Sequence, residues 1–296
     1  MTTPPAPPVP LPVGPSFVVE TSLASVVTPK LNHWLDDLSA AIPRLIDRKD
    51  SEAVHDLRVS LRRIRSLLRV VRSVFGRFHT TRIRAEMQRT AAATGVLRDE
   101  EVLACTLAAL NLDSKHCKAL SEWVCSRKER ETELREEVVE LLAGGALDAP
   151  QAELRALLTL PVQPGRDKEA YGFARRVVLS AQEQVDALRI ADVSNVVGMH
   201  DLRIAYKRLR YAVEALAPVL PPELRAWGQV AVGFQKILGS LHDHDVALEV
   251  VGRAEEMPLV VRIAVLDALS EARMRHAQQY LAAVGLQVVE ANSERG

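Results

Sequence analysis

A row of arginines at helical spacing is the feature of this 296-residue chain with the clearest chemical potential. Residues 54–65 read VHDLRVSLRRIR. If this segment is helical, a step of about 100° per residue brings six basic side chains into one arc of roughly 100°: His55, Arg58, Arg62, Arg65, Arg69 and Arg72. Between Leu57 and Ala85 the sequence has nine arginines and no aspartate or glutamate. Such a row repels itself unless a polyanion or an acidic segment from elsewhere in the fold lies along it.

The same pattern returns in residues 199–210, which read MHDLRIAYKRLR, with His200 in the place of His55. Six positions are identical, and differences such as Val59 to Ile204, Arg62 to Lys207 and Ile64 to Leu209 keep charge or apolar character, which indicates an internal duplication. The second copy contributes four further candidate ligands to the same arc: His200, Arg203, Lys207 and Arg210. Lys236, a further cation in the second half of the chain, is also a candidate ligand. Two copies related by pseudo-symmetry would line a shared groove, and arginine suits planar, two-pronged contact with phosphate oxygens.

Helices are the elements expected to position these residues. Next to the basic arc lies an apolar stripe that can face a core: Leu57, Leu61, Ile64, Leu68, Val71 and Phe75. Aromatic residues make up only 4% of the chain, a composition that favours packed helices. Proline, glycine and the apolar period predict helices over 22–48 (with a kink or break at Pro43), 51–75, 77–94, a short helix to 110, 114–142, 167–190, 195–217, 222–239, 242–256 and 259–285.

The repeat order predicts the architecture. The segment Leu238–Val246 echoes Thr94–Val102, so that two motifs recur in the same order in both halves. We therefore expect an all-α protein made of two similar antiparallel helical bundles that arose by internal duplication, each with its own apolar helix set. The predicted boundaries are a proline-rich disordered tail 1–16, a first repeat 17–145, a linker 146–166, a second repeat 167–289 and a disordered tail 290–296.

Charge and cysteine content narrow the classes of function. The formal net charge is zero, so the whole molecule is not expected to adhere to DNA or to anionic membranes. Three cysteines without a CxxC spacing indicate neither a disulfide framework nor a zinc cluster. The sequence begins without the pattern of a signal peptide and has no uncharged apolar run long enough to span a bilayer. A cytoplasmic protein without a membrane partner is the expectation.

Together, HDLR-V/I followed by R/K-R-I/L-R, and then LGSLHDHDV at 238–246, resemble the CHAD family, the conserved histidine α-helical domain. The resemblance covers roughly residues 17–289. It implies two four-helix bundles related by a pseudo-twofold axis, with basic residues facing a central channel that binds inorganic polyphosphate. It also implies a non-catalytic binding module without a cofactor. Polyphosphate granules are a further expected partner. The matching positions are His55, Arg58, Arg62 and Arg65 in the first motif and His200, Arg203, Lys207 and Arg210 in the second.

Two departures from the repeat stand out. Glu214 occupies the position that Arg69 has in the first copy, so we expect it to shorten the second basic row and to neutralise one of its cations. Arg98 stands in the first copy where the second has His242.

Two other functions remain open on the residues alone. A single-stranded nucleic-acid groove would need aromatic platforms for its bases, and only Tyr206 and Tyr211 lie among the basic rows. A metal-dependent phosphohydrolase would use His-Asp pairs such as those at 242–245. Because neighbouring helical residues point about 100° apart, His242 and His244 are not expected to converge on one ion. We expect no metal site, and we expect Asp243 near a helix start, paired with that terminus or with an arginine.

Overall fold

The fold is that of a computed structural model that describes residues 21–47, 50, 52–162, 165–189 and 192–293. The predicted tail 1–16 lies outside these residues. The described chain consists of α-helices and one 3-10 turn, η1 (Ala217–Val219), and contains no strand in these ranges. The predicted all-α class is therefore confirmed.

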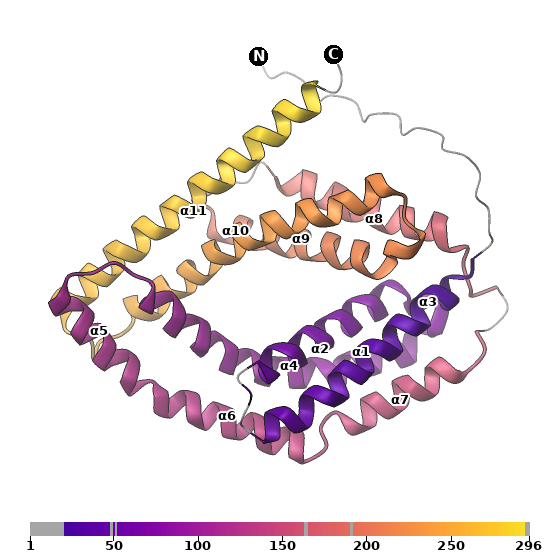
Figure 1. Cartoon of the computed structure of the whole chain (residues 1–296), viewed down its shortest axis with the longest axis horizontal. Coiled ribbons are helices and arrows are strands. Elements are labelled where there is room, and N and C mark those ends of the chain that lie inside the picture. Colours follow the sequence, from indigo (N-terminus) through magenta and orange to yellow (C-terminus); the bar gives the residue numbers. More distant parts are fainter. Residues whose placement is uncertain (1–20, 48–49, 51, 163–164, 190–191, 294–296) are drawn as a thin grey trace.

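The helices form two layers that correspond to the two halves of the chain (Figure 1). The first half comprises α1 (Leu23–Ile46), α2 (Ala53–Val70), α3 (Arg72–Phe75), α4 (Arg77–Ala108), α5 (Ser114–Ser126), α6 (Lys128–Ala143) and α7 (Asp148–Thr159). The second comprises α8 (Ala170–Leu188), α9 (Val196–Leu216), α10 (Pro222–Gly252) and α11 (Leu259–Ser293). α2 packs against α9 between the layers, and α5 meets α11 at the far end.

Two glycines that were expected to end helices lie inside them. α4 runs through Gly95 and α10 runs through Gly239. An interior glycine costs about 1 kcal/mol relative to alanine. That cost is small beside the burial of the flanking Leu97 and of Leu238, which are 0% and 1% exposed. At Gly95 the missing side chain also leaves room for an arginine, because a Cβ there would lie 3.4 Å from Nη1 of Arg58.

Other helix boundaries differ from those expected. α1 continues past Pro43, and the predicted linker 146–166 contains α7. α11 continues beyond 289, through residues predicted as a tail, to Ser293. The helix expected over 114–142 is divided at Arg127, whose guanidinium donates to Glu100 at 2.6 Å. This bend lets α5 pack against α11 while α6 packs against α4.

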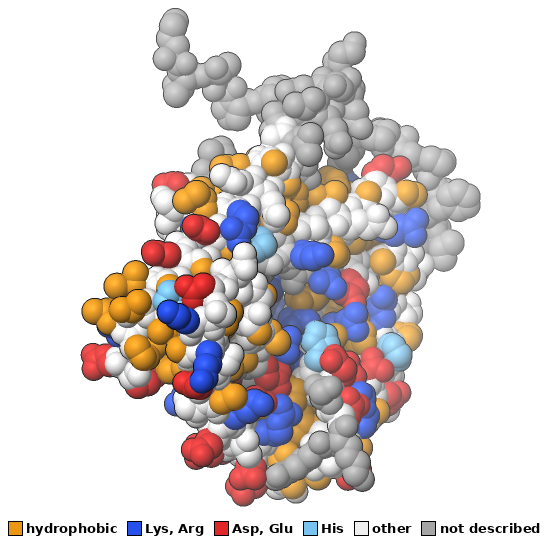
Figure 2. All heavy atoms as spheres, turned by 60° about the vertical axis from the view of Figure 1, so that its left-hand side comes forward, with side chains coloured by type: hydrophobic (Ala, Val, Ile, Leu, Met, Phe, Trp, Pro, Cys, Tyr) orange, Lys and Arg blue, Asp and Glu red, His pale blue; other side chains and the backbone are white. Residues whose placement is uncertain are grey.

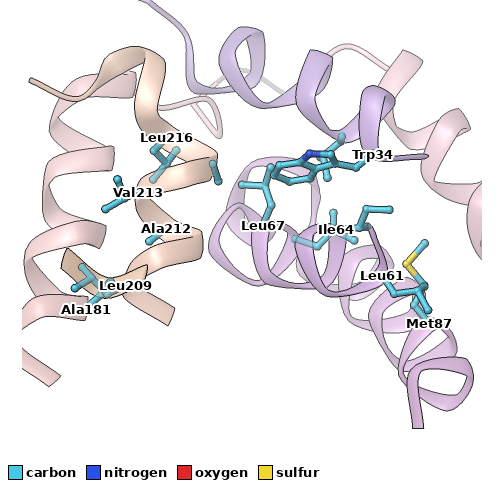
Figure 3. Packing of buried hydrophobic residues seen from close by; sticks show 14 of the residues in the cluster. Trp34, Leu61, Ile64, Leu67, Met87, Ala181, Leu209, Ala212, Val213 and Leu216 are labelled. Atoms are coloured by element: carbon cyan, nitrogen blue, oxygen red, sulfur yellow. The ribbon is translucent and has the colours of Figure 1, made fainter. Parts of the chain in front are cut away.

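The buried side chains do not form one separate core in each half. A single apolar cluster joins α1, α2 and α4 to α8, α9 and α10; it includes Leu61 and Leu67 from the first half and Leu209 and Leu216 from the second (Figure 3). A second cluster joins the ends of α4 and α5 to α10 and α11. The two layers are thus fixed against each other in two places, and the basic faces of α2 and α9 are held at a defined separation.

Candidate functional site

The basic arcs of α2 and α9 meet in a group that we call the central basic cluster, defined as Arg58, Arg62, Arg203 and Lys207. Arg62 is close enough to lower the pKa of Arg203, and Arg203, Arg62 and Arg58 all lower the pKa of Lys207 after burial, which is the largest cause. Both repeats therefore contribute to one site. Figure 2 shows lysine and arginine side chains gathered in a hollow of the surface, with acidic side chains scattered around it.

Arg58 is anchored by the first half of the chain. Its Nη1 donates to the carbonyl of Ala91 and to Oγ1 of Thr94, both at 3.2 Å. Thr94 stands where the second copy has Leu238, so this anchor is a property of the first copy alone. Burial lowers the pKa of Arg58, and the neighbouring Arg62 lowers it further, against an opposing effect of Asp99.

Tyr211 lies beneath the cluster and was not among the predicted ligands. The guanidinium of Arg62 lies over its ring at 5.3 Å from the ring centroid, and that of Arg210 lies at 5.7 Å. Arg210 also donates to Oε1 of Gln235 at 2.9 Å. The tyrosine thus orients two predicted ligands through cation–π contacts. Its position beside Arg210 in the sequence was the available signal.

The cationic surface extends beyond the predicted arc at the end of α2. Nε of Arg84, on α4, donates to the carbonyl of Arg65 at 3.1 Å. Burial lowers the pKa of Arg65, and Arg84 and Arg69 lower it further. Arg208, on α9, lies near Arg69 and lowers its pKa in addition to burial. Sequence periodicity missed Arg84 and Arg208 because their placement depends on how α4 and α9 pack against α2.

Acidic groups lie at the opposite end of the cluster. The negative charge of Asp243 opposes the lowering of the Arg203 pKa. Burial raises the pKa of Asp243 itself, and Arg203 opposes that shift. The expected pairing with an arginine is thus present only as an electrostatic interaction, because no ion pair or hydrogen bond joins Asp243 to Arg203 in the described chain. The expected helix start is absent, since α10 is continuous around this residue. The negative charge of Asp99 opposes the lowering of the pKa of both Arg58 and Arg203.

The histidines form two separate pairs. The rings of His200 and His242 lie 4.9 Å apart, and those of His244 and His276 lie 5.0 Å apart. Burial, together with Arg203, lowers the pKa of His242 to about 4, so this imidazole is neutral at neutral pH. Among the described residues no group of three or more His, Cys, Asp or Glu side chains is arranged to hold a metal ion.

Three predicted features lie outside the cluster. His55 and Lys236 are exposed, and neither makes a hydrogen bond or an ion pair to another described residue. Glu214 does not neutralise the second basic row, which corrects the expectation. Its Oε1 pairs instead with Nη2 of Arg63 at 2.6 Å, and its carbonyl accepts from Lys30 at 3.0 Å. The reason is that Glu214 faces α1 and α2 across the layers rather than the groove side of α9.

The fold and the site together define an all-helical protein with a cationic cluster shared between two helical layers. The chain belongs to the CHAD family: a model of the CHAD domain matches residues 30–252. The fold is similar to that of the CHAD domain from the plant Ricinus communis, with a TM-score of 0.67, 21% identity, and coverage of 92% of this chain and 91% of that one.

It is also similar to PptA from Streptomyces chartreusis, with a TM-score of 0.67, 16% identity, and coverage of 90% of this chain and 99% of that chain. No curated protein matches the sequence. Within the described chain, no helix is both long and apolar enough to cross a membrane.

Lys207 gives the central basic cluster a charge that depends on pH. Burial, with Arg203, Arg62 and Arg58 nearby and only Asp243 opposing, lowers the Lys207 pKa from 10.5 to about 7. Because the folded value is the lower one, the free protein gains stability from this group as pH rises above about 7. A bound polyanion favours the charged amine, so binding above that pH requires proton uptake. We expect the affinity for polyphosphate to fall as pH rises from about 7 to 9.

Calorimetry in buffers of different ionisation enthalpy would measure the proton uptake. Lys207→Arg removes the titration while keeping the charge, so its affinity should be nearly independent of pH over the same range. An equal slope in this variant would assign the pH dependence to another group.

Proposed function

We propose that this protein binds inorganic polyphosphate, without catalysis, in the central basic cluster and its extension along α2. The observation that carries the proposal is a set of buried polar atoms without hydrogen-bond partners. In the described part of the chain these atoms are Nε of Arg62, Arg65 and Arg203 and the hydroxyl of Tyr211. All four lie on the facing helices α2 and α9.

Buried donors left without an acceptor cost roughly 1–3 kcal/mol each. Native proteins rarely leave such groups together unless a ligand or solvent satisfies them. The three guanidinium groups and the phenol donate, so the missing partner is an acceptor, and the uniform positive charge around them favours an anion. A chain of phosphates supplies acceptor oxygens at each repeat and matches cations spaced along two helices.

The tyrosines favour polyphosphate over single-stranded nucleic acid. Tyr211 is buried, and its ring is already in contact with the guanidinium groups of Arg62 and Arg210. Tyr206 is buried and stacks on Phe234, with ring centroids 4.8 Å apart. Neither ring is a free platform on which bases could stack. A ligand without bases therefore fits this cluster better.

The assignment of binding rather than hydrolysis rests on the positions of the histidines and aspartates. The ring of His242 lies beside that of His200, whereas the ring of His244 lies beside that of His276. The two histidines of the 242–245 segment therefore contact different residues. A hydrolytic metal pair needs several such side chains directed at one point. Asp243, a carboxylate whose pKa is raised by burial, interacts electrostatically with Arg203.

Titration with polyphosphate of medium chain length, followed by competition with excess single-stranded RNA, tests the proposal. We expect saturable binding that RNA does not displace, and no release of orthophosphate during prolonged incubation with divalent metal ions. Displacement by RNA of equal charge would favour the nucleic-acid function. Metal-dependent phosphate release would favour the hydrolase.

A further inference from the structure

A pocket outside the central basic cluster lies between α2, α8 and α9. Its volume is about 340 Å³, at the lower end of the range for small-molecule sites. The floor is apolar and includes Leu67, Val177, Ala181, Ala212 and Leu216. The lining also includes three arginines, Arg69, Arg176 and Arg208, and contains no acidic residue. This combination calls for a ligand with an apolar body and an anionic group.

The internal repeat shows which charge is missing from the pocket. The register that places His200 on His55 also places Arg208 on Arg63 and Glu214 on Arg69. On one side of the molecule, Arg63 and Glu214 form an ion pair at 2.6 Å. On the other side, the equivalent residues are the two arginines of the pocket.

Arg69 and Arg208 are close neighbours, since Arg208 lowers the pKa of Arg69. Neither forms an ion pair with an acidic side chain of the described chain, and Arg208 instead donates to Oε1 of Gln184 at 3.3 Å. The position that holds a carboxylate in one contact therefore holds a second cation in the equivalent contact. A bound anion between the two guanidinium groups would restore the balance that Glu214 provides on the other side.

We propose that this pocket binds the nucleoside end of a nucleoside polyphosphate, with the base on the apolar floor and the phosphates on Arg69 and Arg208. The pocket adjoins the phosphate row: Arg69 is one helical turn beyond Arg65 on α2, and Tyr211 both lines the pocket and lies beneath Arg62. One ligand can thus occupy both. The inference rests on the proposed function, because the phosphates use the same cations.

Neutral polar groups in the lining favour a heterocyclic base over an alkyl chain. Ser66, Ser180 and Gln184 line the pocket together with its apolar floor. The Gln184 carbonyl oxygen accepts from Arg208, and its amide NH₂ has no partner among the described residues. A nucleobase has apolar faces and an edge of donors and acceptors, so it uses both surfaces. An alkyl chain would make no use of these polar groups.

The test compares ATP with inorganic tripolyphosphate by isothermal titration calorimetry of the full chain, in magnesium-free buffer. Both ligands carry three phosphates, and tripolyphosphate has the greater negative charge, so tighter binding of ATP can come only from its nucleoside. We expect ATP to bind about tenfold more tightly than tripolyphosphate, equivalent to about 1.4 kcal/mol. Equal or weaker binding of ATP overturns the inference, as does tight binding of dodecyl phosphate in preference to ATP.

Two substitutions on α8 sharpen the comparison. Ala181→Leu fills the floor of the pocket, whereas Ala187→Leu adds the same atoms at an exposed position of the same helix. Ala181→Leu should remove the advantage of ATP and leave tripolyphosphate binding unchanged, and Ala187→Leu should alter neither. Equal weakening of both ligands by Ala181→Leu contradicts the pocket assignment.

Arg69→Glu is a variant that does not depend on tolerance of a larger side chain. It recreates the Arg63–Glu214 type of pair, so we expect a higher melting temperature together with loss of ATP binding; retained ATP binding would contradict the proposal. The two proposals fail in different ways. If neither tripolyphosphate nor longer polyphosphate binds, the proposed function fails. If these bind and ATP gains nothing, only the nucleoside site fails.

Discussion

Raising potassium chloride from about 50 to about 200 mM should weaken polyphosphate binding by roughly a hundredfold. Engaging about five cations with a flexible polyanion releases condensed counterions, and the logarithm of the affinity then falls by about 0.7 per contact for each decade of salt. The cations available are Arg58, Arg62, Arg65, Arg203 and Lys207. Affinity measured at four or more salt concentrations gives the slope directly.

The slope of the logarithm of affinity against the logarithm of salt concentration also gives the number of protein cations that contact the ligand. Replacing chloride by a bulkier anion at constant potassium distinguishes screening of the ligand from competition by anions at the protein. A slope near zero would contradict binding through the basic cluster, because the contacts would then not be ionic.

Replacing both Arg58 and Arg203 by alanine should weaken polyphosphate binding by about a hundredfold or more. Each side chain offers a charge-assisted contact worth roughly 1.5–3 kcal/mol, which corresponds to about tenfold or more for each substitution alone. The two arginines come from different repeats, and a ligand that bridges α2 and α9 loses both contacts in the double variant. Arg203→Lys should fall between wild type and Arg203→Ala, because lysine keeps the charge and loses the two-pronged geometry.

Two controls separate the site from net charge and from folding. Arg253→Ala removes an exposed cation that pairs with Glu249 at the end of α10, and it should not change the affinity. Arg63→Ala breaks the pair with Glu214 and the contact with Trp34, so it should lower the melting temperature more than the affinity. If Arg253→Ala and Arg203→Ala weaken binding equally, the ligand responds to total charge and the ordered cluster is wrong.

Circular dichroism and thermal unfolding must accompany these measurements. Arg58 donates to Ala91 and Thr94, so its removal also breaks two hydrogen bonds that join α2 to α4. A loss of binding in Arg58→Ala is evidence for a direct contact with the ligand only if the helicity of the variant is unchanged at the temperature of the titration.

The sequence alone determined the helical class, the repeat of the motif and the arc of basic residues on each copy. These properties are local: a period of 3.6 residues fixes which side chains of one helix share a face. The family followed from the same residues. Gly95 and Gly239 misled the helix boundaries because tertiary packing around them outweighed a small local cost.

The tertiary structure decided which faces meet. Arg58 and Arg203 converge because α2 packs against α9, whereas His55, in the same predicted arc, stays exposed. Arg84 joins the cationic surface from α4, outside the predicted basic arc. Glu214 pairs with Arg63, and the equivalent contact brings Arg69 to Arg208. Contacts between helices depend on their rotation and offset, which the side chains of the whole core set together, so no local pattern in either repeat could have predicted them.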